Sequence, residues 1–336
     1  MRLAIFSKVY TCILLSILGN CQNSKLNNPT SDNFVYYDPL VKISTDTSSK
    51  IFPAEWSRAP MSAHAEPLSA QEASRSIAVV RNALDKYPKS VINNNINNIY
   101  LCFNLLINNT KVGGIQCKSN KSIYINNNGA EDGYSNSEIE KLIHHELAHL
   151  LMEYYGRKFS RKKWERLNSR RFRYGKGGLE YQIKHHGRSD TSDEECLKKG
   201  FVNEYAMSDF DEDFASTVEA MFQGTQKFWS AVDQNKILQD KVKMVMSFYQ
   251  SIDKSMTEAY FEQIRQAQAL VPPEEDGPVH YGPNQQIPFP WGGSTWYPNP
   301  VTGVPVYIKI ERGGTGSYPP GGGYTMNPKP DGPRAR

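Results

Sequence analysis

The sequence lacks three features that would point to large classes of protein. None of its apolar runs reaches the ~18–20 residues that cross a bilayer as a helix, which excludes a polytopic membrane protein. The formal net charge of its 336 residues is only +4, which excludes a histone-like or acidic-tail protein. Its five cysteines show no zinc-finger spacing. The composition, with 39% hydrophobic and 22% charged residues, is that of a globular chain with polar, unstructured parts.

The N-terminus has the pattern of a secretory signal. A short basic region precedes an apolar stretch at residues 9–19, and a polar run begins directly after Cys21. This ending is similar to the lipobox of bacterial lipoproteins, although Asn20 departs from the small residue that is usual there. An ordinary secretory signal or a short membrane anchor is the alternative. We expect residues 1–20 to be removed and Cys21 to be lipidated, which tethers the protein to the membrane in the bacterial cell envelope, at the outer membrane or cell surface.

Composition divides the remaining chain into three parts. Residues 21–52 are rich in Ser, Asn, Thr and Asp and predict a flexible tether. Residues 53–270 have the apolar patterning of a folded domain. Residues 271–336 form a Pro- and Gly-rich low-complexity tail, since 14 prolines and 12 glycines fall within its last 65 residues. This tail is either a flexible surface segment or a segment that binds the cell wall or a partner.

Apolar spacing predicts the main elements of the folded part. Helical spacing runs over residues 70–87, and a second helix opens with a capping box, Ser135 with Glu138, and continues to Leu151. Residues 99–107 and 122–126 are strand-like and predict a β-hairpin.

The mature chain would keep three thiols. Cys102 and Cys117 flank the predicted hairpin, so a disulfide between them is one option and two buried, unpaired cysteines are the other. Cys196 has no obvious partner.

The chemistry is concentrated in one helix, in the sequence His144-His145-Glu146-Leu147-Ala148-His149. His145 and His149 are four residues apart, so both imidazoles project from one face and can bind one Zn²⁺. Glu146 points into the same cleft, where it can act as general base toward a zinc-activated water. His144 has no partner at this spacing and is expected to be a neighbour rather than a ligand. The segment predicts a zinc-dependent hydrolase.

A catalytic zinc of this type needs a third protein ligand. Met152 and Tyr155 exclude the arrangement in which a third histidine follows on the same segment, so a glutamate further along is expected. Two candidates remain open on the residues alone. Glu204 lies in a segment close to the Asn-Glu-x-x-Ser-Asp of thermolysin-like enzymes, but with one residue too many; Glu212 opens an apolar-patterned helix.

Residues 200–206 and 212–215 resemble the Tyr-Ala and Glu-x-Phe-Ala-Glu elements of gluzincin metallopeptidases. These include bacterial lipoproteins known as "putative zinc-binding metallopeptidases" and the catalytic domain of anthrax lethal factor. The resemblance spans roughly residues 70–266. It implies an α+β, zincin-like metallopeptidase domain with a small mixed sheet, an HExxH active-site helix and C-terminal helices. It also implies Glu212, seven residues after Tyr205, as the third zinc ligand, and Tyr205 as the group that stabilises the oxyanion.

A basic insert follows the zinc helix. Residues 157–188 contain 12 Lys or Arg and only two acidic residues, Glu165 and Glu180. The insert either attracts acidic substrates or an anionic surface, or is a solvated face paired with the acidic remainder of the protein. It contains no nucleic-acid reader motif. His185 and His186, at its end, could orient a substrate.

The sequence therefore predicts a membrane-tethered zinc metallopeptidase that acts on a peptide or protein substrate, binds no nucleic acid, and has an open oligomeric state. The alternative is a non-catalytic surface lipoprotein, an adhesin or binding module, that keeps the zincin scaffold. Ser216 leaves room for this alternative, because it stands where the resembled element has a glutamate.

Overall fold

The computed structural model describes residues 35–38, 41–185, 191–269, 296–298 and 305–307, which all belong to one unit spanning residues 33–336. The predicted signal peptide (1–20), Cys21 and most of the predicted tail lie outside the described residues. Within the tail, two short strands pair antiparallel, β8 (Trp296–Pro298) and β9 (Pro305–Tyr307). None of the described helices is long and apolar enough to cross a bilayer.

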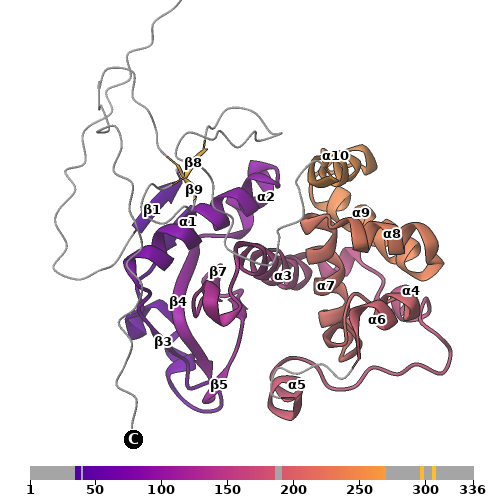
Figure 1. Ribbon diagram of the computed structural model, residues 1–336. Coiled ribbons are helices and arrows are strands. Elements are labelled where there is room, and N and C mark those ends of the chain that lie inside the picture. The colour runs from indigo at the N-terminus through magenta and orange to yellow at the C-terminus, as the bar shows by residue number, and fades with distance from the viewer. Residues whose placement is uncertain (1–34, 39–40, 186–190, 270–295, 299–304, 308–336) are drawn as a thin grey trace, which may run out of the picture. The chain divides into compact units, whose positions relative to one another are not determined.

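A mixed sheet forms one side of the unit (Figure 1). Its strands are β1 (Val35–Asp38), β2 (Val41–Ser44), β3 (His64–Glu66), β4 (Asn98–Ile107), β5 (Thr110–Lys111), β6 (Gly114–Cys117) and β7 (Ser122–Asn126). The main order is β1-β2-β4-β7-β6, and β3 and β5 pair with the second half of β4. Strand β4 is parallel to both β2 and β7, while β6 runs antiparallel to β7 at the edge.

The predicted hairpin of residues 99–107 and 122–126 is wrong, because these strands lie side by side in parallel. Parallel neighbours need a crossover, and the β5–β6 segment supplies it. The hairpins within this stretch are β4–β5 and β6–β7. Between β4 and β5, Asn108 and Asn109 have φ of 49° and 59°, the left-handed pair that a two-residue type I′ turn requires.

This strand order also decides against a disulfide between Cys102 and Cys117. Cys102 lies on β4 and Cys117 on β6, and β7 runs between them. Two inter-strand spacings amount to about 9.6 Å, beyond the ~7 Å limit between the Cα atoms of a disulfide. All three cysteines of the described part, Cys196 included, are free and buried.

The described part also contains ten α-helices and five short 3₁₀ turns. The α-helices are α1 (Ala70–Asp85), α2 (Lys89–Asn95), α3 (Asn136–Tyr155), α4 (Arg161–Glu165), α5 (Gly178–His185), α6 (Asp193–Lys199), α7 (Phe210–Gln223), α8 (Gln226–Gln234), α9 (Lys236–Ile252) and α10 (Glu258–Ala269). The 3₁₀ turns are η1 (Ser49–Ile51), η2 (Ala54–Ser57), η3 (Ala130–Asp132), η4 (Gly156–Lys158) and η5 (Tyr205–Met207).

Helix α3 is the central element, since it packs against α7 and α1 as well as against β6 and β7 (Figure 1). Its N-cap is the predicted Ser135, whose hydroxyl accepts a hydrogen bond from the Glu138 amide at 3.1 Å. The sheet thus lies on one side of α3 and the helices α7 to α10 on the other. The predicted α+β class, with a small mixed sheet, an HExxH helix and C-terminal helices, is confirmed.

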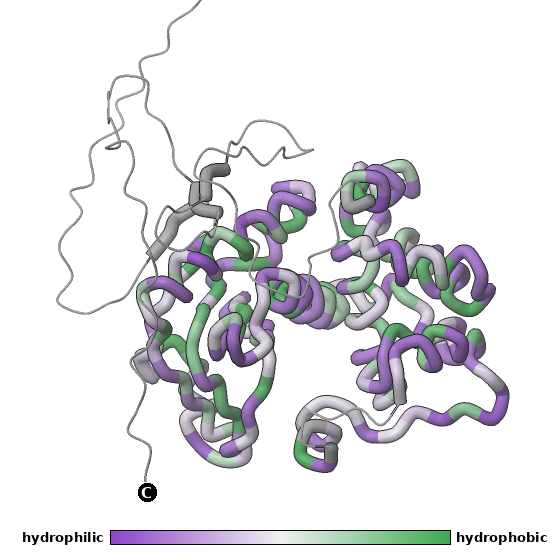
Figure 2. The backbone as a smooth tube through the Cα atoms, in the orientation of Figure 1, coloured by the Kyte–Doolittle hydropathy of each residue, from purple (hydrophilic) through white to green (hydrophobic). Residues whose placement is uncertain are grey.

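The sheet buries both of its faces, as alternation along a strand allows. Ile99 and Leu101 of β4 face α1 and α3 in the main core, while Tyr100 and Cys102 face a second, smaller core. Figure 2 shows hydrophobic stretches along these strands and mixed hydropathy along the helices, as expected of helices with one buried face. Residues 45–63 cover the second core, where the Tyr124 hydroxyl donates to the Ile51 carbonyl at 2.7 Å.

The predicted tether of residues 21–52 is wrong for its last twelve residues. Val41 and Ile43 of β2 are 2% and 0% exposed, and β2 pairs with β4 inside the sheet. Ile51 and Phe52 pack in the second core. Because β2 is only four residues long, its apolar residues are too few to stand out from the polar sequence around them. The folded part therefore begins before residue 53.

Candidate metal centre

His145 and His149 meet on one face of α3. Their Nε2 atoms are 3.0 Å apart, as the spacing of four residues in a helix predicts. His145 is buried and His149 is partly exposed. The two imidazoles therefore present one nitrogen each to a common point.

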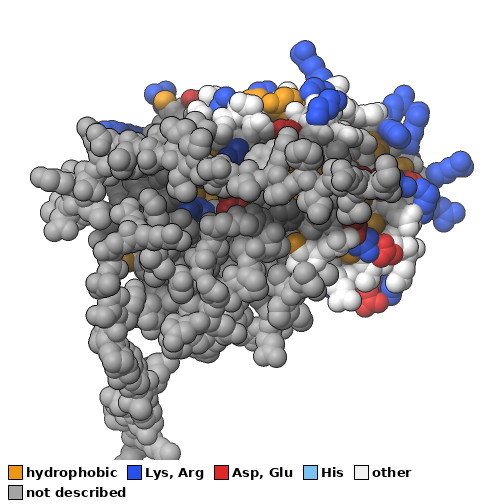
Figure 3. Space-filling model, turned by 90° about the horizontal axis from the view of Figure 1, so that it is seen from above, with side chains coloured by type: hydrophobic (Ala, Val, Ile, Leu, Met, Phe, Trp, Pro, Cys, Tyr) orange, Lys and Arg blue, Asp and Glu red, His pale blue; other side chains and the backbone are white. Residues whose placement is uncertain are grey.

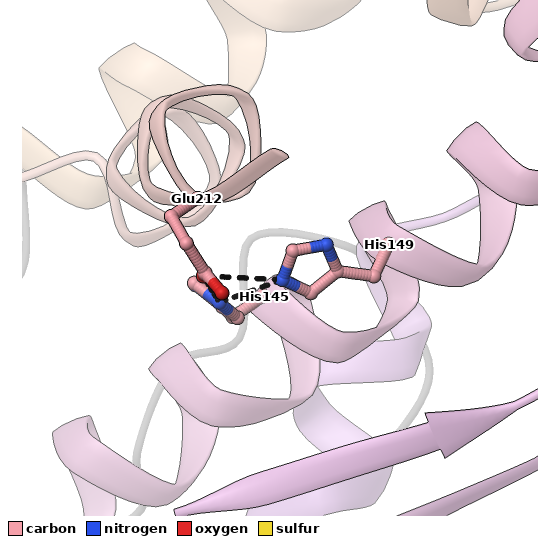
Figure 4. A group of neighbouring side chains, drawn as sticks. All are labelled: His145, His149 and Glu212. Carbon is pink, nitrogen blue, oxygen red and sulfur yellow. Dashed lines mark hydrogen bonds and ion pairs between the residues drawn. The ribbon is translucent and has the colours of Figure 1, made fainter. Parts of the chain in front are cut away.

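Glu212 approaches the same point from α7 (Figure 4). Its Oε2 atom is 3.0 Å from His145 Nε2 and 3.3 Å from His149 Nε2. The position follows from the local sequence, because Asp209 caps α7 and its Oδ1 accepts a hydrogen bond from the Glu212 amide at 2.8 Å. Glu212 is thus fixed in the first turn of α7, facing α3.

The three side chains fit a zinc ion by geometry and by chemistry. Ligand atoms at about 2.0–2.1 Å from a tetrahedral zinc lie about 3.3 Å from one another. The observed separations of 3.0, 3.0 and 3.3 Å match the edges of such a tetrahedron. Burial alone would raise the pKa of Glu212, but the imidazoles of His149 and His145 outweigh it and hold that pKa below its usual value. Glu212 is therefore a carboxylate, the form that binds a metal.

Glu219 is a functional residue that the sequence reasoning missed. Its Oε2 atom accepts a hydrogen bond from His145 Nδ1 at 2.8 Å, on the far side of the imidazole from the cluster. A carboxylate in this position fixes the ring and the tautomer that leaves Nε2 free for a metal. The signal was available in the sequence, because Glu212 and Glu219 are seven residues apart and therefore two turns apart on one face of α7.

Ser216 lies between these two glutamates on α7. Its side chain is fully buried, and its Oγ atom has no hydrogen-bond partner among the described residues. The carboxylate that the resembled element carries at this position is therefore missing, while Glu219, one turn further along, contacts the zinc-site histidine instead.

Glu146 lies between the metal cluster and the edge strand β6. A Cβ atom on Gly114 would come within 2.8 Å of both Cγ and Oε1 of Glu146, so glycine is needed for the strand to approach this closely. Burial, the largest effect, raises the pKa of Glu146 above its usual value. A carboxyl group with a raised pKa is suited to accept a proton and release it again.

Tyr205 borders the cluster from η5. Its ring stacks on His145 with centroids 6.0 Å apart and meets the Tyr181 ring of α5 edge-on, with centroids 5.2 Å apart. Burial and the charge of Glu212 raise the pKa of Tyr205 well above its usual value. Its hydroxyl therefore keeps its proton at neutral pH and can donate a hydrogen bond.

The other predicted site residues lie elsewhere. Glu204 accepts a hydrogen bond from the Thr191 amide at 2.6 Å and is not part of the cluster. His144 points away from it and pairs with the Tyr87 hydroxyl through Nδ1 at 2.9 Å. The side chain of His185 and the whole of His186 lie outside the described residues.

All the site groups open into one cleft of about 610 Å³. Helix α3 forms its floor, the β4–β5 and β5–β6 segments form one wall, and η5, α7 and Gly178 form the other. The lining residues are Ile107, Val112, Gly113, Gly114, Ile115, Gln116, Tyr134, Glu138, Lys141, Leu142, His145, Glu146, His149, Gly178, Asn203, Tyr205, Glu212 and Glu219.

The buried Asp213 of α7 joins α9 and the basic insert. Asp213, next to Glu212, accepts hydrogen bonds from Lys241 of α9 at 2.7 and 2.9 Å. It also accepts one from Trp164 Nε1 of α4 at 2.8 Å and one from the Tyr174 hydroxyl at 2.5 Å. Trp164 and Tyr174 of the insert thus have a structural role, while the basic residues of the insert on α4 are exposed.

Exposed basic residues also occur outside the insert, for example Lys227 of α8 and Lys243 of α9. Figure 3 shows Lys and Arg side chains projecting from the right-hand part of one face, over the helical side of the unit. Inside the insert, two cations have acidic partners within four residues, Arg161 with Glu165 and Lys176 with Glu180.

A family comparison agrees with the metal site. Residues 106–271 match a protein family described as "Putative zinc-binding metallo-peptidase". A solved structure from Bacteroides caccae with the same description matches at 14% identity and a TM-score of 0.39, over 62% of this chain and 81% of that one. No curated protein matches.

The family match covers α3, α7 and the residues between them, and so includes His145, His149 and Glu212. The family is zinc-binding and these residues can hold one metal ion, which confirms zinc as the predicted cofactor. The resemblance drawn from the sequence is confirmed as well, because residues 106–271 match the family model of putative zinc-binding metallopeptidases.

Proposed function

We propose that this protein is a zinc-dependent peptidase that hydrolyses peptide bonds in the cleft above α3. One observation carries the proposal: the buried Glu146 lies in the same cleft as a His145–His149–Glu212 cluster with the spacing of a three-ligand zinc site. Three protein ligands leave a fourth position open for reaction, whereas structural zinc sites use four. The family description supports the same chemistry.

Zinc, when bound, supplies a Lewis acid that activates water and polarises the scissile carbonyl. Glu146 accepts the proton of the attacking water and passes it to the departing amine, for which its raised pKa suits it. Tyr205 donates its hydroxyl proton in a hydrogen bond to the carbonyl oxygen as negative charge develops there. Glu219 keeps the His145 ring in place through Nδ1.

The test is peptide hydrolysis by the zinc-loaded protein, with Glu146→Gln as the decisive variant. The wild type is expected to cleave members of a broad peptide library, and Glu146→Gln to lose at least about 100-fold in kcat/KM while it binds one zinc per chain. Glu262→Gln, an exposed residue of α10, is the matched control and keeps full activity. Zinc binding without cleavage of any peptide would instead favour the non-catalytic binding module.

We further propose that Cys21 is lipidated and that the protein is anchored to the bacterial cell envelope. The apolar stretch that ends at this cysteine and the polar run behind it support the proposal. Growth with a labelled fatty acid is expected to label the wild type and not Cys21→Ser. Labelling of both proteins, or of neither, would contradict the anchor.

A further inference from the structure

The cleft contains one cationic side chain that has no role in the proposed catalytic scheme. In the described part of the chain, four carboxylates line the cleft. Glu212 belongs to the metal cluster, Glu219 bonds His145, Glu146 is the proposed base, and Glu138 pairs with Lys141. Among the described residues that line the cleft, Lys141 is the only lysine, and no arginine lines it. A lone permanent cation in a substrate cleft is a candidate for recognising an anionic group.

Lys141 lies close to the reacting centre. It precedes His145 by four residues on α3, so its Cα lies about 6 Å from that of His145 along the helix axis and on the same face. An extended peptide advances about 3.3 Å per residue. With its long side chain, Lys141 can therefore reach a group carried by a residue close to the scissile bond.

Lys141 is charged and only partly neutralised. The charge of Glu219 raises the pKa of Lys141 more than its burial lowers it, and Glu138 raises it further. The ammonium group has three donors, and the pair with Glu138 at 3.3 Å uses one. The two side chains are 32% and 37% exposed. A partly exposed pair between residues three apart on one helix is weak, so a substrate carboxylate can displace Glu138 or share the ammonium with it.

We propose that Lys141 is a specificity-determining residue that binds a carboxylate of the substrate on a residue close to the scissile bond. The inference rests on the proposed peptidase function. The carboxylate belongs either to an Asp or Glu side chain or to the C-terminus of a short peptide, and the chemistry at Lys141 is the same in both cases.

The test compares matched peptides that differ only in this charge. One set replaces Glu by Gln at each position around the cleavage site, and the second set replaces the C-terminal carboxylate by an amide. The wild type is expected to prefer the charged peptide of one set by about tenfold or more in kcat/KM, as a hydrogen bond to a charged group allows. The set that shows the preference identifies the source of the carboxylate.

The variants separate recognition from structure. Lys141→Gln is expected to lower kcat/KM for the charged peptide to that of its neutral partner, with zinc content and activity on the neutral peptide unchanged. Lys141→Arg keeps the preference, and Lys243→Gln, an exposed lysine of α9, behaves as the wild type. A preference that persists in Lys141→Gln, equal losses on both peptides, or no preference in the wild type overturns the inference.

A binding measurement separates this inference from the peptidase proposal. Zinc-loaded Glu146→Gln should bind the charged peptide more tightly than the neutral one, and adding Lys141→Gln should abolish the difference. If the wild type cleaves nothing, the peptidase proposal fails while this affinity difference still decides the role of Lys141. Equal affinities for both peptides reject that role.

Discussion

Three glutamates around the metal cluster have different roles because each meets a different neighbour. Glu212 faces two imidazole nitrogens, Glu219 faces the opposite nitrogen of His145, and Glu146 faces Gly114 and the open cleft. Residue type alone does not separate these roles. Position on the two packed helices does, because α7 places Glu212 and Glu219 at the two ring nitrogens of His145, while Glu146 is carried by α3 itself.

Glu219→Gln is expected to weaken zinc binding about 10- to 100-fold. The amide keeps the size of the side chain but removes the negative charge that makes His145 a better ligand. The zinc dissociation constant, measured by competition with a chelator, checks this, with Glu262→Gln as the control. An unchanged dissociation constant would show that the hydrogen bond to Nδ1 has no influence on the metal.

The site residues that could be predicted from the sequence are those that lie close together along the chain. His145, Glu146 and His149 lie within five residues of one another, and helix geometry alone brings the histidines together. Glu212 came from a resemblance, and Glu204 stayed open, because a contact across 67 residues depends on how α7 packs on α3. The contact of Glu219 with His145 depends on the same packing, although the spacing of seven residues from Glu212 already placed both glutamates on one face of α7.

Helix α3 is held to its neighbours by a polar contact behind the metal site. Lys86, the C-cap residue of α1, forms an ion pair with Glu140 of α3 and donates to the Phe222 carbonyl of α7 at 2.9 Å. Burial alone would raise the pKa of Glu140, but the Lys86 ammonium and the His144 hydrogen bond outweigh it and lower that pKa to about 2. One contact thus joins the three helices around the cleft.

The depressed pKa of Glu140 predicts a pH dependence of stability. A carboxylate of lowered pKa stabilises the fold above its unfolded value of 4.5, and this contribution is lost as the pH falls toward 2. The full loss is at most about 3 kcal/mol. Urea unfolding at pH 6, 4 and 2.5 measures it, and Glu140→Gln should lose less stability than the wild type over this range. Parallel curves for the two proteins would contradict the assignment.

Helices and strands could be predicted from the sequence where capping residues and apolar periodicity agree. The pairing of the strands could not. The Ser135 cap and the apolar spacing after it placed α3 to within four residues of its observed end. Residues 99–107 and 122–126 are strands, but nothing in their sequence distinguishes a hairpin from a parallel pair. The parallel pairing of β4 with β7 depends on β6, which pairs with β7 and forms the edge of the sheet.

At the scale of the whole molecule, the fold extends further toward the N-terminus than composition indicated. Strand β2 and the segment after it contribute Val41, Ile43, Ile51 and Phe52 to the two cores. Burial of each such side chain contributes about 1.5–3 kcal/mol, so the four together approach the stability of a typical domain.

A chain of residues 53–270 is therefore expected to be less stable than a chain of residues 35–270 by at least about 3 kcal/mol, or not to fold. Urea unfolding followed by circular dichroism compares the two chains. Equal unfolding midpoints would mean that residues 35–52 lie on the surface without supporting the cores.

The central claim is that His145, His149 and Glu212 together hold one catalytic zinc. Zinc titration of the wild type, Glu212→Ala and Glu204→Ala tests it most directly, with folding of each protein checked by circular dichroism. The account predicts one zinc per chain in the wild type and in Glu204→Ala with similar affinity, and a loss of at least about 100-fold in Glu212→Ala. Full zinc affinity in Glu212→Ala, or its loss in Glu204→Ala, would contradict the account.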